Sequence, residues 1–385
     1  MSSLYFDHAA SAPRRPEVLE ATLPWTTGVV GNPAGTHSAA RRARRAIEDA
    51  RDEVADFLGV TPTNTLFTAG GTESCHLAIA GTVQRFRRSH ANTSVVVSAF
   101  EHHAVLTSAE LMESLFDDVT TRLMPVGADG CIELDSLTSL VDASTAVVSV
   151  MAVNNETGII QPLEALRARL DDLGTTTLVH TDAIAAAPWM DVALSTASAH
   201  LISLCAHKLG GPVNAGALGL RDATIEAVVP GGAQERGLRG GTVDVAAAVG
   251  LAMACRLTRH ERVANSAHCR ELQVRLQKAM TAVEGVSVTG ESVERVPGTV
   301  HLLISGVSSD EVLFLLDQAG VSASAGAACS SGATSASHVM TAMGVRPELA
   351  RGSLRLSMGG ETTHDDVDAL ASILTGVIAR LRPSA

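Results

Sequence analysis

Aromatic residues are scarce in this chain and make up only 3% of its 385 residues. Charged residues account for 18% and hydrophobic residues for 46%, a balance that excludes intrinsic disorder and allows a sizeable core. With so few aromatic rings, that core must be built from Ala, Val and Leu. The length suits one large domain and a smaller one.

Cysteines are few and widely spaced. None of the six lies in a CxxC or CxxH pattern, which disfavours a zinc site or a disulfide framework, so no metal is expected. They are Cys75, Cys131, Cys205, Cys255, Cys269 and Cys329.

Long apolar runs are missing as well. No stretch of about 18 uninterrupted apolar residues occurs, so no membrane span is expected. The segment Met1–Asp7 has neither the basic nor the apolar region of a secretion signal. We therefore expect a soluble, cytoplasmic protein without a membrane partner.

Basic residues are fewer than acidic ones, 29 against 41, which gives a net charge of −12. This balance argues against a nucleic-acid footprint, and no direct nucleic-acid binding is expected. The one dense basic stretch, residues 41–45, precedes four acidic residues between positions 48 and 53 on the same predicted helix. This spacing favours ion pairs on a solvated helix face.

Helical and strand patterns alternate from about residue 39 to residue 300. This alternation predicts an α/β fold with a doubly wound, mostly parallel sheet. Helices are expected over about residues 244–257 and 260–283, the second of them linking two domains. The predicted strands are Thr65–Thr68, Val95–Ser98, Ala146–Val150, Leu178–Thr181, Leu201–Cys205 and Ala217–Leu220.

The C-terminal part has a different pattern, which predicts a small α+β domain. Strands are expected at about residues 285–289 and 299–305, and Ser308-Ser-Asp-Glu311 has the spacing of a capping box that opens a helix. A strand at Leu354–Met358 and a helix from about Thr363 to Leu381 complete the domain.

Residues 322–337 contain only Ser, Ala, Gly and Thr apart from Cys329. Nothing in this segment can anchor a core, so a mobile loop is predicted. A passive linker is one interpretation, but a single soft nucleophile near its centre favours a functional loop. We assign residues 14–258 to the large domain, and residues 1–13 and 259–385 to the small domain that carries this loop.

Asp182 and Lys208 give the strongest chemical signal. Each ends or follows an apolar run with the length of a buried parallel strand, and ligands of open α/β sheets bind where such strands end. Pyridoxal 5'-phosphate (PLP) needs such a pair: a lysine forms a Schiff base with its aldehyde, and an aspartate keeps its pyridine nitrogen protonated. A buried ion pair or two rim charges would give the same pattern, so the interpretation depends on the surrounding motifs.

Three further segments follow predicted strands. Phe67-Thr-Ala-Gly-Gly-Thr-Glu-Ser74 places glycines between a strand and a helix, where backbone N–H groups and the Thr72 hydroxyl can hold a phosphate. His102 can stack on a flat ring or move protons. Asn155 can bond a phenolic oxygen or a substrate carboxylate. The alternatives are an ordinary turn, a satisfied loop histidine and an Asx turn.

Together these residues resemble a cysteine desulfurase of the NifS/IscS group, within the class V aminotransferase family of fold-type I PLP enzymes. The resemblance covers nearly the whole chain, and its motifs occur in the family's order. They are Phe6-Asp-His-Ala-Ala10, Gly31-Asn-Pro33 with His37, Gly71-Thr-Glu-Ser74, Glu101-His102, Val153-Asn-Asn-Glu-Thr-Gly158, His180-Thr-Asp-Ala183, Ala206-His-Lys-Leu-Gly-Gly-Pro212, Gly231-Gly-Ala-Gln-Glu-Arg-Gly-Leu-Arg-Gly-Gly-Thr242, Ala325-Gly-Ala-Ala-Cys-Ser-Ser-Gly332 and Leu354-Arg-Leu-Ser-Met-Gly359.

The resemblance implies cofactor-binding roles. Lys208 would hold PLP and transfer the substrate's α-proton, Asp182 would pair with the pyridine nitrogen, and His102 would stack on the ring. Residues near the glycine-rich turn and Lys208 would hold the phosphate, with one hydroxyl from the partner subunit of a homodimer. They are Gly71, Thr72, Cys205 and His207, and Thr242 from the partner.

The resemblance also implies how sulfur is moved. Arg355 would clamp the carboxylate of L-cysteine, with Asn155, which also contacts the cofactor, and Asn32 in the substrate site. Cys329 would attack the substrate's Sγ, leaving L-alanine and an enzyme persulfide, with His102 as the base that deprotonates the thiol. The sulfur would pass to an acceptor protein, scaffold or small molecule, in iron–sulfur cluster assembly or in thio-modification.

The chain departs from the family pattern at several positions. Ala185 replaces a glutamine that usually bonds the cofactor's phenolic oxygen, and Cys205 replaces a phosphate-binding serine. Val213 and Asn214 replace the usual Gly and Lys, and Cys75 with His76 alters the pocket wall. These departures indicate a specialised paralogue with a dedicated acceptor.

Two other functions are left open. A C–S lyase or selenocysteine lyase would release the chalcogen without a protein persulfide, and Cys329 argues against it. A degenerate, non-catalytic scaffold subunit would account for Ala185 and Cys205, but the presence of Lys208 and Asp182 argues against it.

Overall fold

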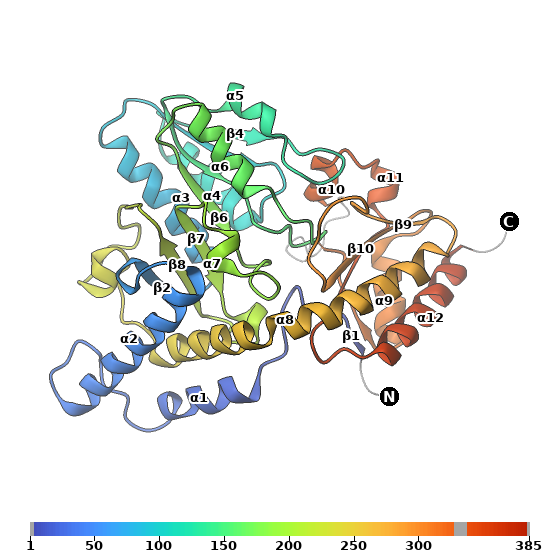
Figure 1. The fold of residues 1–385 in the computed structure, drawn as a ribbon, viewed down its shortest axis with the longest axis horizontal. Coiled ribbons are helices and arrows are strands. Elements are labelled where there is room, and N and C mark those ends of the chain that lie inside the picture. Colours follow the sequence, from blue (N-terminus) through green and yellow to red (C-terminus); the bar gives the residue numbers. More distant parts are fainter. Residues whose placement is uncertain (1–3, 327–336, 383–385) are drawn as a thin grey trace.

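A seven-stranded sheet forms the centre of the larger part of the molecule in the computed structural model, which describes residues 4–326 and 337–382 (Figure 1). The strand order is β2-β8-β7-β6-β5-β3-β4, and β8 is antiparallel to both of its neighbours while the other pairings are parallel. The predicted α/β fold with a mostly parallel sheet is confirmed. The strands are β2 (Thr65–Thr68), β3 (Thr93–Ser98), β4 (Val119–Met124), β5 (Thr145–Ser149), β6 (Leu178–Asp182), β7 (Leu201–Cys205) and β8 (Gly216–Leu220).

The edge strand β4 was not predicted from the sequence. Its middle, Thr120-Thr-Arg122, is polar and partly exposed, because the strand has a neighbour on one side only. The alternation of apolar residues that marks a half-buried strand is therefore weak there.

Helices cover both faces of the large sheet, because neighbouring residues along each strand pack on opposite sides. Leu66 and Val95 join one apolar cluster with α3 and α4, whereas Phe67 and Val96 join the cluster on the other face. The first face carries α3 (Gly71–Arg87) and α4 (His103–Leu115); the second carries α2 (Ser38–Leu58), α6 (Leu163–Asp172), α7 (Val192–Ser195) and the start of α8.

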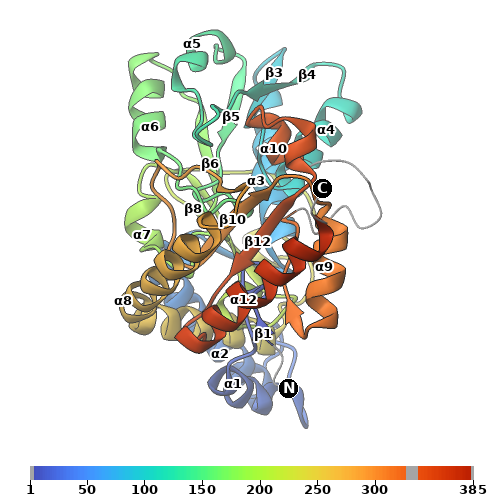
Figure 2. The same cartoon turned by 90° about the vertical axis from the view of Figure 1, so that its right-hand side faces the viewer.

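A smaller antiparallel sheet lies at the other end of the molecule, packed beneath α9 and α12 (Figure 2). Its strand order is β12-β10-β9, and a separate parallel pair, β1 with β11, brings the N-terminus beside it. The elements are β1 (Leu4–Tyr5), β9 (Val286–Val288), β10 (Thr299–Ile304), α9 (Ser309–Gln318), β11 (Val321–Ser322), β12 (Ser353–Ser357) and α12 (His364–Leu381).

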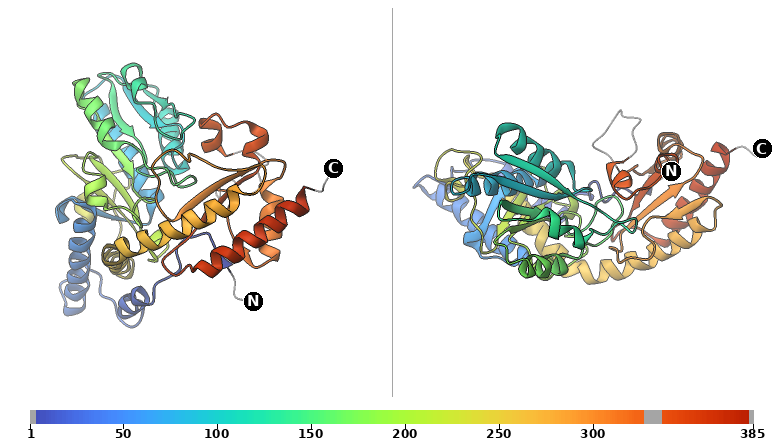
Figure 3. Two further views of the ribbon diagram at one scale, coloured as in Figure 1. Left: turned by 45° about the vertical axis from the view of Figure 1, so that its right-hand side comes forward. Right: turned by 90° about the horizontal axis from the view of Figure 1, so that it is seen from above.

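One long helix, α8 (Val245–Thr281), connects the two parts (Figure 3). Two separate helices were predicted here, and that prediction was wrong: no Pro or Gly follows Gly250 in this stretch, so nothing in the backbone interrupts the helix. Asp244 caps its start by accepting from the Ala247 N–H at 3.1 Å. The domain division after residue 258 stays a prediction, since α8 crosses that position.

The predicted capping box at Ser308 is wrong in detail. Ser308 is the N-cap of α9, but its side chain makes no capping hydrogen bond. The capping box is found instead at α12, where Thr363 and Asp366 bond reciprocally.

Short helices complete the fold. They are α1 (Pro16–Thr26), α5 (Leu137–Leu140), α10 (His338–Ala342) and α11 (Pro347–Ala350), with 3₁₀ turns at Pro62–Asn64, Leu134–Ser136, His207–Leu209 and Gln234–Gly237. Within the described residues, no helix combines the length and apolar character that crossing a membrane requires.

Candidate active site

A cavity of about 250 Å³ lies where the strand ends of the large sheet meet the small sheet. It gathers most of the residues predicted from the sequence, from segments far apart in the chain. Its lining includes Gly71, Thr72, His102, Asn155, Asp182, Ala185, His207, Lys208 and Arg355.

The wall formed by the start of α3 suits a phosphate. Gly70 adopts a φ of +139°, a conformation that favours glycine, and α3 begins at the next residue. A Cβ on Gly71 would lie 2.2 Å from Ile184 Cδ1, so a side chain there would crowd the wall. The first N–H groups of a helix have no partner within it and attract an anion.

His207 lies near this wall and retains free hydrogen-bonding capacity. Its Nε2 is 3.8 Å from Cys205 Sγ, and its Nδ1 is buried without a partner among the described residues. Burial and the nearby Lys208 lower the pKa of His207 to about 4, so the ring is neutral. An unsatisfied buried nitrogen at this point is consistent with a group that enters the cavity.

Asp182 ends β6 and is 6% exposed. Its Oδ1 accepts a hydrogen bond from the Ile184 N–H at 2.8 Å, which fixes the carboxylate, and Cys75 Sγ donates to Oδ2 over 3.8 Å. Burial raises the pKa of the Cys75 thiol well above its usual range, so it stays a donor. The carboxylate is thus held in position to pair with a cationic ring nitrogen.

Lys208 follows β7, and its amine makes no hydrogen bond or ion pair with any residue that the structure describes. Desolvation by burial lowers its pKa below the ordinary lysine value. The neutral amine is the form that attacks an aldehyde, and a lowered pKa increases the fraction of lysine in that form.

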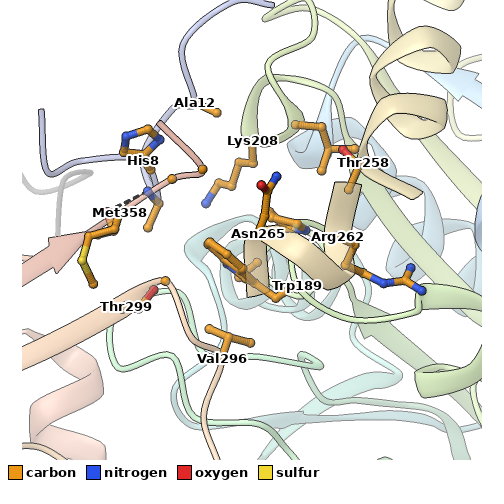
Figure 4. A pocket seen from close by; sticks show the side chains of 18 of the residues that line it. His8, Ala12, Trp189, Lys208, Thr258, Arg262, Asn265, Val296, Thr299 and Met358 are labelled. Atoms are coloured by element: carbon orange, nitrogen blue, oxygen red, sulfur yellow. Dashed lines mark hydrogen bonds between the residues drawn. The ribbon is translucent and has the colours of Figure 1, made fainter. Parts of the chain in front are cut away.

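A second, larger cavity of about 470 Å³ adjoins the first. Lys208, Asn155 and Ala185 line both cavities. Figure 4 shows the Lys208 side chain extending into the larger one, with His8 and Asn265 nearby. The small side chain of Ala185, where the family pattern has glutamine, therefore lies at the junction of the two cavities.

His102 is the N-cap of α4, and its Nδ1 accepts from the Ala104 N–H at 3.0 Å. Burial lowers the pKa of His102, so the ring is neutral near pH 7. With Nδ1 accepting, the remaining proton sits on Nε2. Taking a proton from a thiol would require the ring to release the Ala104 N–H.

Arg355, on β12, is 2% exposed and is already paired. Its Nη2 donates to Asp7 Oδ1 at 2.8 Å and its Nη1 to the Asn155 carbonyl at 3.0 Å. Its Nε is buried without a partner among the described residues. The sequence carries no signal for a role of Asp7 beyond its place in the motif at residues 6–10.

Glu101 also received no role, although it precedes His102. It is fully buried, and its Oε1 accepts from the Ser98 hydroxyl at 2.7 Å and the Met151 N–H at 2.6 Å. Burial raises its pKa to about 8. Its motif position was the only signal in the sequence.

Three of the described residues predicted for the site do not line this cavity. One is Cys205, which ends β7 and whose Sγ lies 3.8 Å from His207 Nε2. Thr242 lines a separate cavity of about 200 Å³ beside Phe67 and Asn214. Asn32 is exposed, and its Oδ1 accepts from the Ala34 N–H at 2.9 Å. Cys329 lies outside the described residues.

Known proteins resemble this chain along nearly its whole length. The model of the aminotransferase class-V family matches residues 4–370. The IscS-like cysteine desulfurase of Mycobacterium tuberculosis is 39% identical over 388 residues, which cover 99% of this chain and 98% of that protein. Among solved structures, a NifS-like protein matches with a TM-score of 0.90 at 28% identity, over 98% of this chain and 100% of that one. SspA in complex with cysteine matches with a TM-score of 0.80 at 31% identity, over 94% and 100%.

The chain belongs to the class V aminotransferase family of fold-type I, PLP-dependent enzymes. Within that family it is an enzyme of the cysteine desulfurase type, in the NifS/IscS group. The cavity fits the cofactor. The start of α3, the Lys208 amine, which has no bonding partner among the described residues, and the fixed Asp182 carboxylate match the phosphate, aldehyde and pyridine nitrogen of PLP.

Proposed function

We propose that this enzyme carries the sulfur of L-cysteine on Cys329 as a persulfide. The reaction balances without a further reactant: the Cys329 thiol and L-cysteine give Cys329–S–SH and L-alanine. An S–S bond forms, the substrate's C–S bond breaks, and the proton of the enzyme thiol ends formally on the alanine methyl group. Cys329 follows Gly326, a residue of the cofactor cavity, by three positions, and three residues span at most about 11 Å.

The observation that carries the proposal is the state of Lys208. A buried amine with a lowered pKa and no hydrogen-bond partner among the described residues lies in the same cavity as the Asp182 carboxylate. Bound PLP supplies an electrophilic aldehyde and a ring that accepts the electron pair of the substrate's Cα–H bond. Lys208 holds the cofactor and takes the Cα proton at Nζ, and Asp182 favours a proton on the pyridine nitrogen.

Other residues orient cofactor and substrate. His102 stacks on the ring and holds a proton on Nε2, since its Nδ1 is engaged by Ala104. Arg355 binds the substrate carboxylate, and Asn155 contacts both cofactor and substrate. Gly71, Thr72 and His207 line the cavity and would hold the phosphate, with Cys205 behind them beside His207.

Thr242 and Asn32 act in another subunit's site. Both lie outside the cofactor cavity of their own chain, which supports a contribution to the cavity of a partner. This placement supports a homodimer in which each subunit completes the other's active site.

We infer a cytoplasmic acceptor protein, in iron–sulfur cluster assembly or in thio-modification. The IscS-like relative supports the first, and the unusual Ala185 and Cys205 support a dedicated acceptor. Sulfur transfer from the persulfide form to several candidate acceptors tests this inference, and equal transfer to all of them speaks against dedication.

The function itself is tested by incubating the holoenzyme with L-cysteine, measuring alanine and locating the persulfide by peptide mass spectrometry. Cys329→Ala should retain the absorbance of bound PLP but form neither persulfide nor sulfide. Cys131→Ala, a partly buried cysteine outside the cofactor cavity, is the matched control and should behave like the unmodified enzyme. Sulfide release by Cys329→Ala at the unmodified rate would instead identify a C–S or selenocysteine lyase.

A further inference from the structure

The residues on both sides of segment 327–336 are held by hydrogen bonds near the cofactor cavity. On the N-terminal side, the Arg355 N–H donates to the Ser324 carbonyl at 2.7 Å, and Gly326 lines the cavity. On the C-terminal side, Ser337 caps α10 by accepting from the Val339 N–H at 3.1 Å. His338 follows and is bonded through Nε2 to the Glu101 carbonyl at 2.9 Å.

A single carboxylate, that of Glu156, touches both ends. Its Oε2 accepts a hydrogen bond from the Ser337 hydroxyl at 2.6 Å. The same oxygen is packed against Gly326, where a Cβ would lie only 3.0 Å away. Glu156 is 2% exposed and also lines the cofactor cavity, so its contacts with Ser337 and Gly326 lie in the wall of that cavity.

The two ends belong to different parts of the fold. Val321, just before the N-terminal end, is in the apolar cluster of the small sheet. Val339 and Met340, on α10, are in the cluster of the large sheet. Glu156 therefore joins two segments whose buried residues belong to different apolar clusters, and it does so next to the cofactor cavity.

We propose that Glu156 is a positioning residue for Cys329, because it holds Gly326 and Ser337, the described residues on either side of the segment that carries the thiol. The inference rests on the proposed function, since it assigns the sulfur-accepting role to Cys329. The Ser337 hydroxyl links Glu156 to α10, because it donates a hydrogen bond to Glu156 and accepts the one that caps the helix.

Ser337 provides the test, because it contacts Glu156 without lining the cofactor cavity. In a single turnover of the holoenzyme with L-cysteine, we measure the substrate-induced change in cofactor absorbance and the rate of persulfide formation on Cys329. Ser337→Ala should leave the absorbance change and its cysteine dependence unaltered. It should slow persulfide formation about tenfold, the size expected for losing a hydrogen bond to a charged group. Ser337→Thr keeps the hydroxyl and should restore the rate.

Ser337→Asp separates the bond to Glu156 from the helix cap. Aspartate can cap α10 but cannot donate to Glu156, so persulfide formation should be at least as slow as in Ser337→Ala. A normal rate in Ser337→Ala or in Ser337→Asp overturns the inference. Absence of any persulfide on Cys329 in the unmodified enzyme overturns the proposed function, and this inference with it.

Discussion

Asp7 and Arg355 form an ion pair of 2.8 Å at the edge of the cofactor cavity, although 348 residues separate them in the chain. The contact brings the N-terminal segment against β12 and orients the guanidinium before substrate arrives. It also means that a substrate carboxylate must share the guanidinium with Asp7.

Replacing Arg355 should therefore affect substrate binding before it affects the cofactor. Arg355→Lys loses the planar fork that pairs with a carboxylate and should raise KM for L-cysteine by about tenfold or more. Asp7→Asn is the control, because asparagine retains an oxygen that accepts a hydrogen bond from Arg355 Nη2. Its KM for L-cysteine should stay close to that of the unmodified enzyme. Steady-state kinetics with the PLP absorbance as a reference measures both. Equal effects of the two substitutions would contradict a direct role of Arg355 in binding the carboxylate.

The raised pKa of Glu101 predicts a pH dependence of stability. Its pKa rises from 4.5 to about 8 mainly through burial, so between these values the folded state holds a proton that the unfolded state has lost. The free energy of unfolding must then fall as pH rises through this window. Glu101→Gln has no such proton, so its unfolding free energy does not fall in this way. Between pH 5 and pH 8, the difference in unfolding free energy between the variant and the unmodified protein should shift by about 2–4 kcal/mol in favour of the variant. Denaturant unfolding at both pH values measures the difference; a constant offset between the proteins would contradict the shift.

A buried ion pair anchors the segment that carries Thr242. Arg51 bonds Glu235 through two contacts of 2.7 and 2.8 Å, and Glu235 also accepts from the Phe67 N–H on edge strand β2 at 2.7 Å. Arg51→Met leaves a buried carboxylate unpaired and should cost about 3–5 kcal/mol of unfolding free energy. Adding Glu235→Gln should recover part of the loss. An equal or larger loss in the double variant, measured by urea unfolding, would show that the pair's charges are not coupled.

Mixed dimers test whether Thr242 serves the partner's site. Neither Lys208→Ala nor Thr242→Ala homodimers should bind PLP normally. A dimer with one subunit of each kind has one intact site only if Thr242 acts across the interface. Co-expressed, differently tagged subunits should then regain activity, up to half of the unmodified level. No recovery above the two homodimers would place Thr242 in its own subunit's site.

The sequence predicted those parts of the site that local patterns determine. Asp182 and Lys208 follow buried apolar strands, and the ends of neighbouring strands necessarily meet at one edge of a sheet. The polar edge strand β4 and the unbroken helix α8 escaped prediction because neither carries a clear local signal. The partners of Arg355 escaped for a different reason: pairing with Asp7 and Asn155 arises from packing of segments far apart in the chain, which no spacing reveals.

The assignment of PLP to Lys208 is the central claim, and the chain makes it directly testable because it contains only two lysines, Lys208 and Lys278. Lys278 is exposed on α8 and does not line the cofactor cavity, so it is an internal control. Borohydride reduction of the purified holoenzyme, followed by peptide mass spectrometry, should place one pyridoxyl group on Lys208 and none on Lys278. A pyridoxyl group on Lys278, or on neither lysine, would contradict the account.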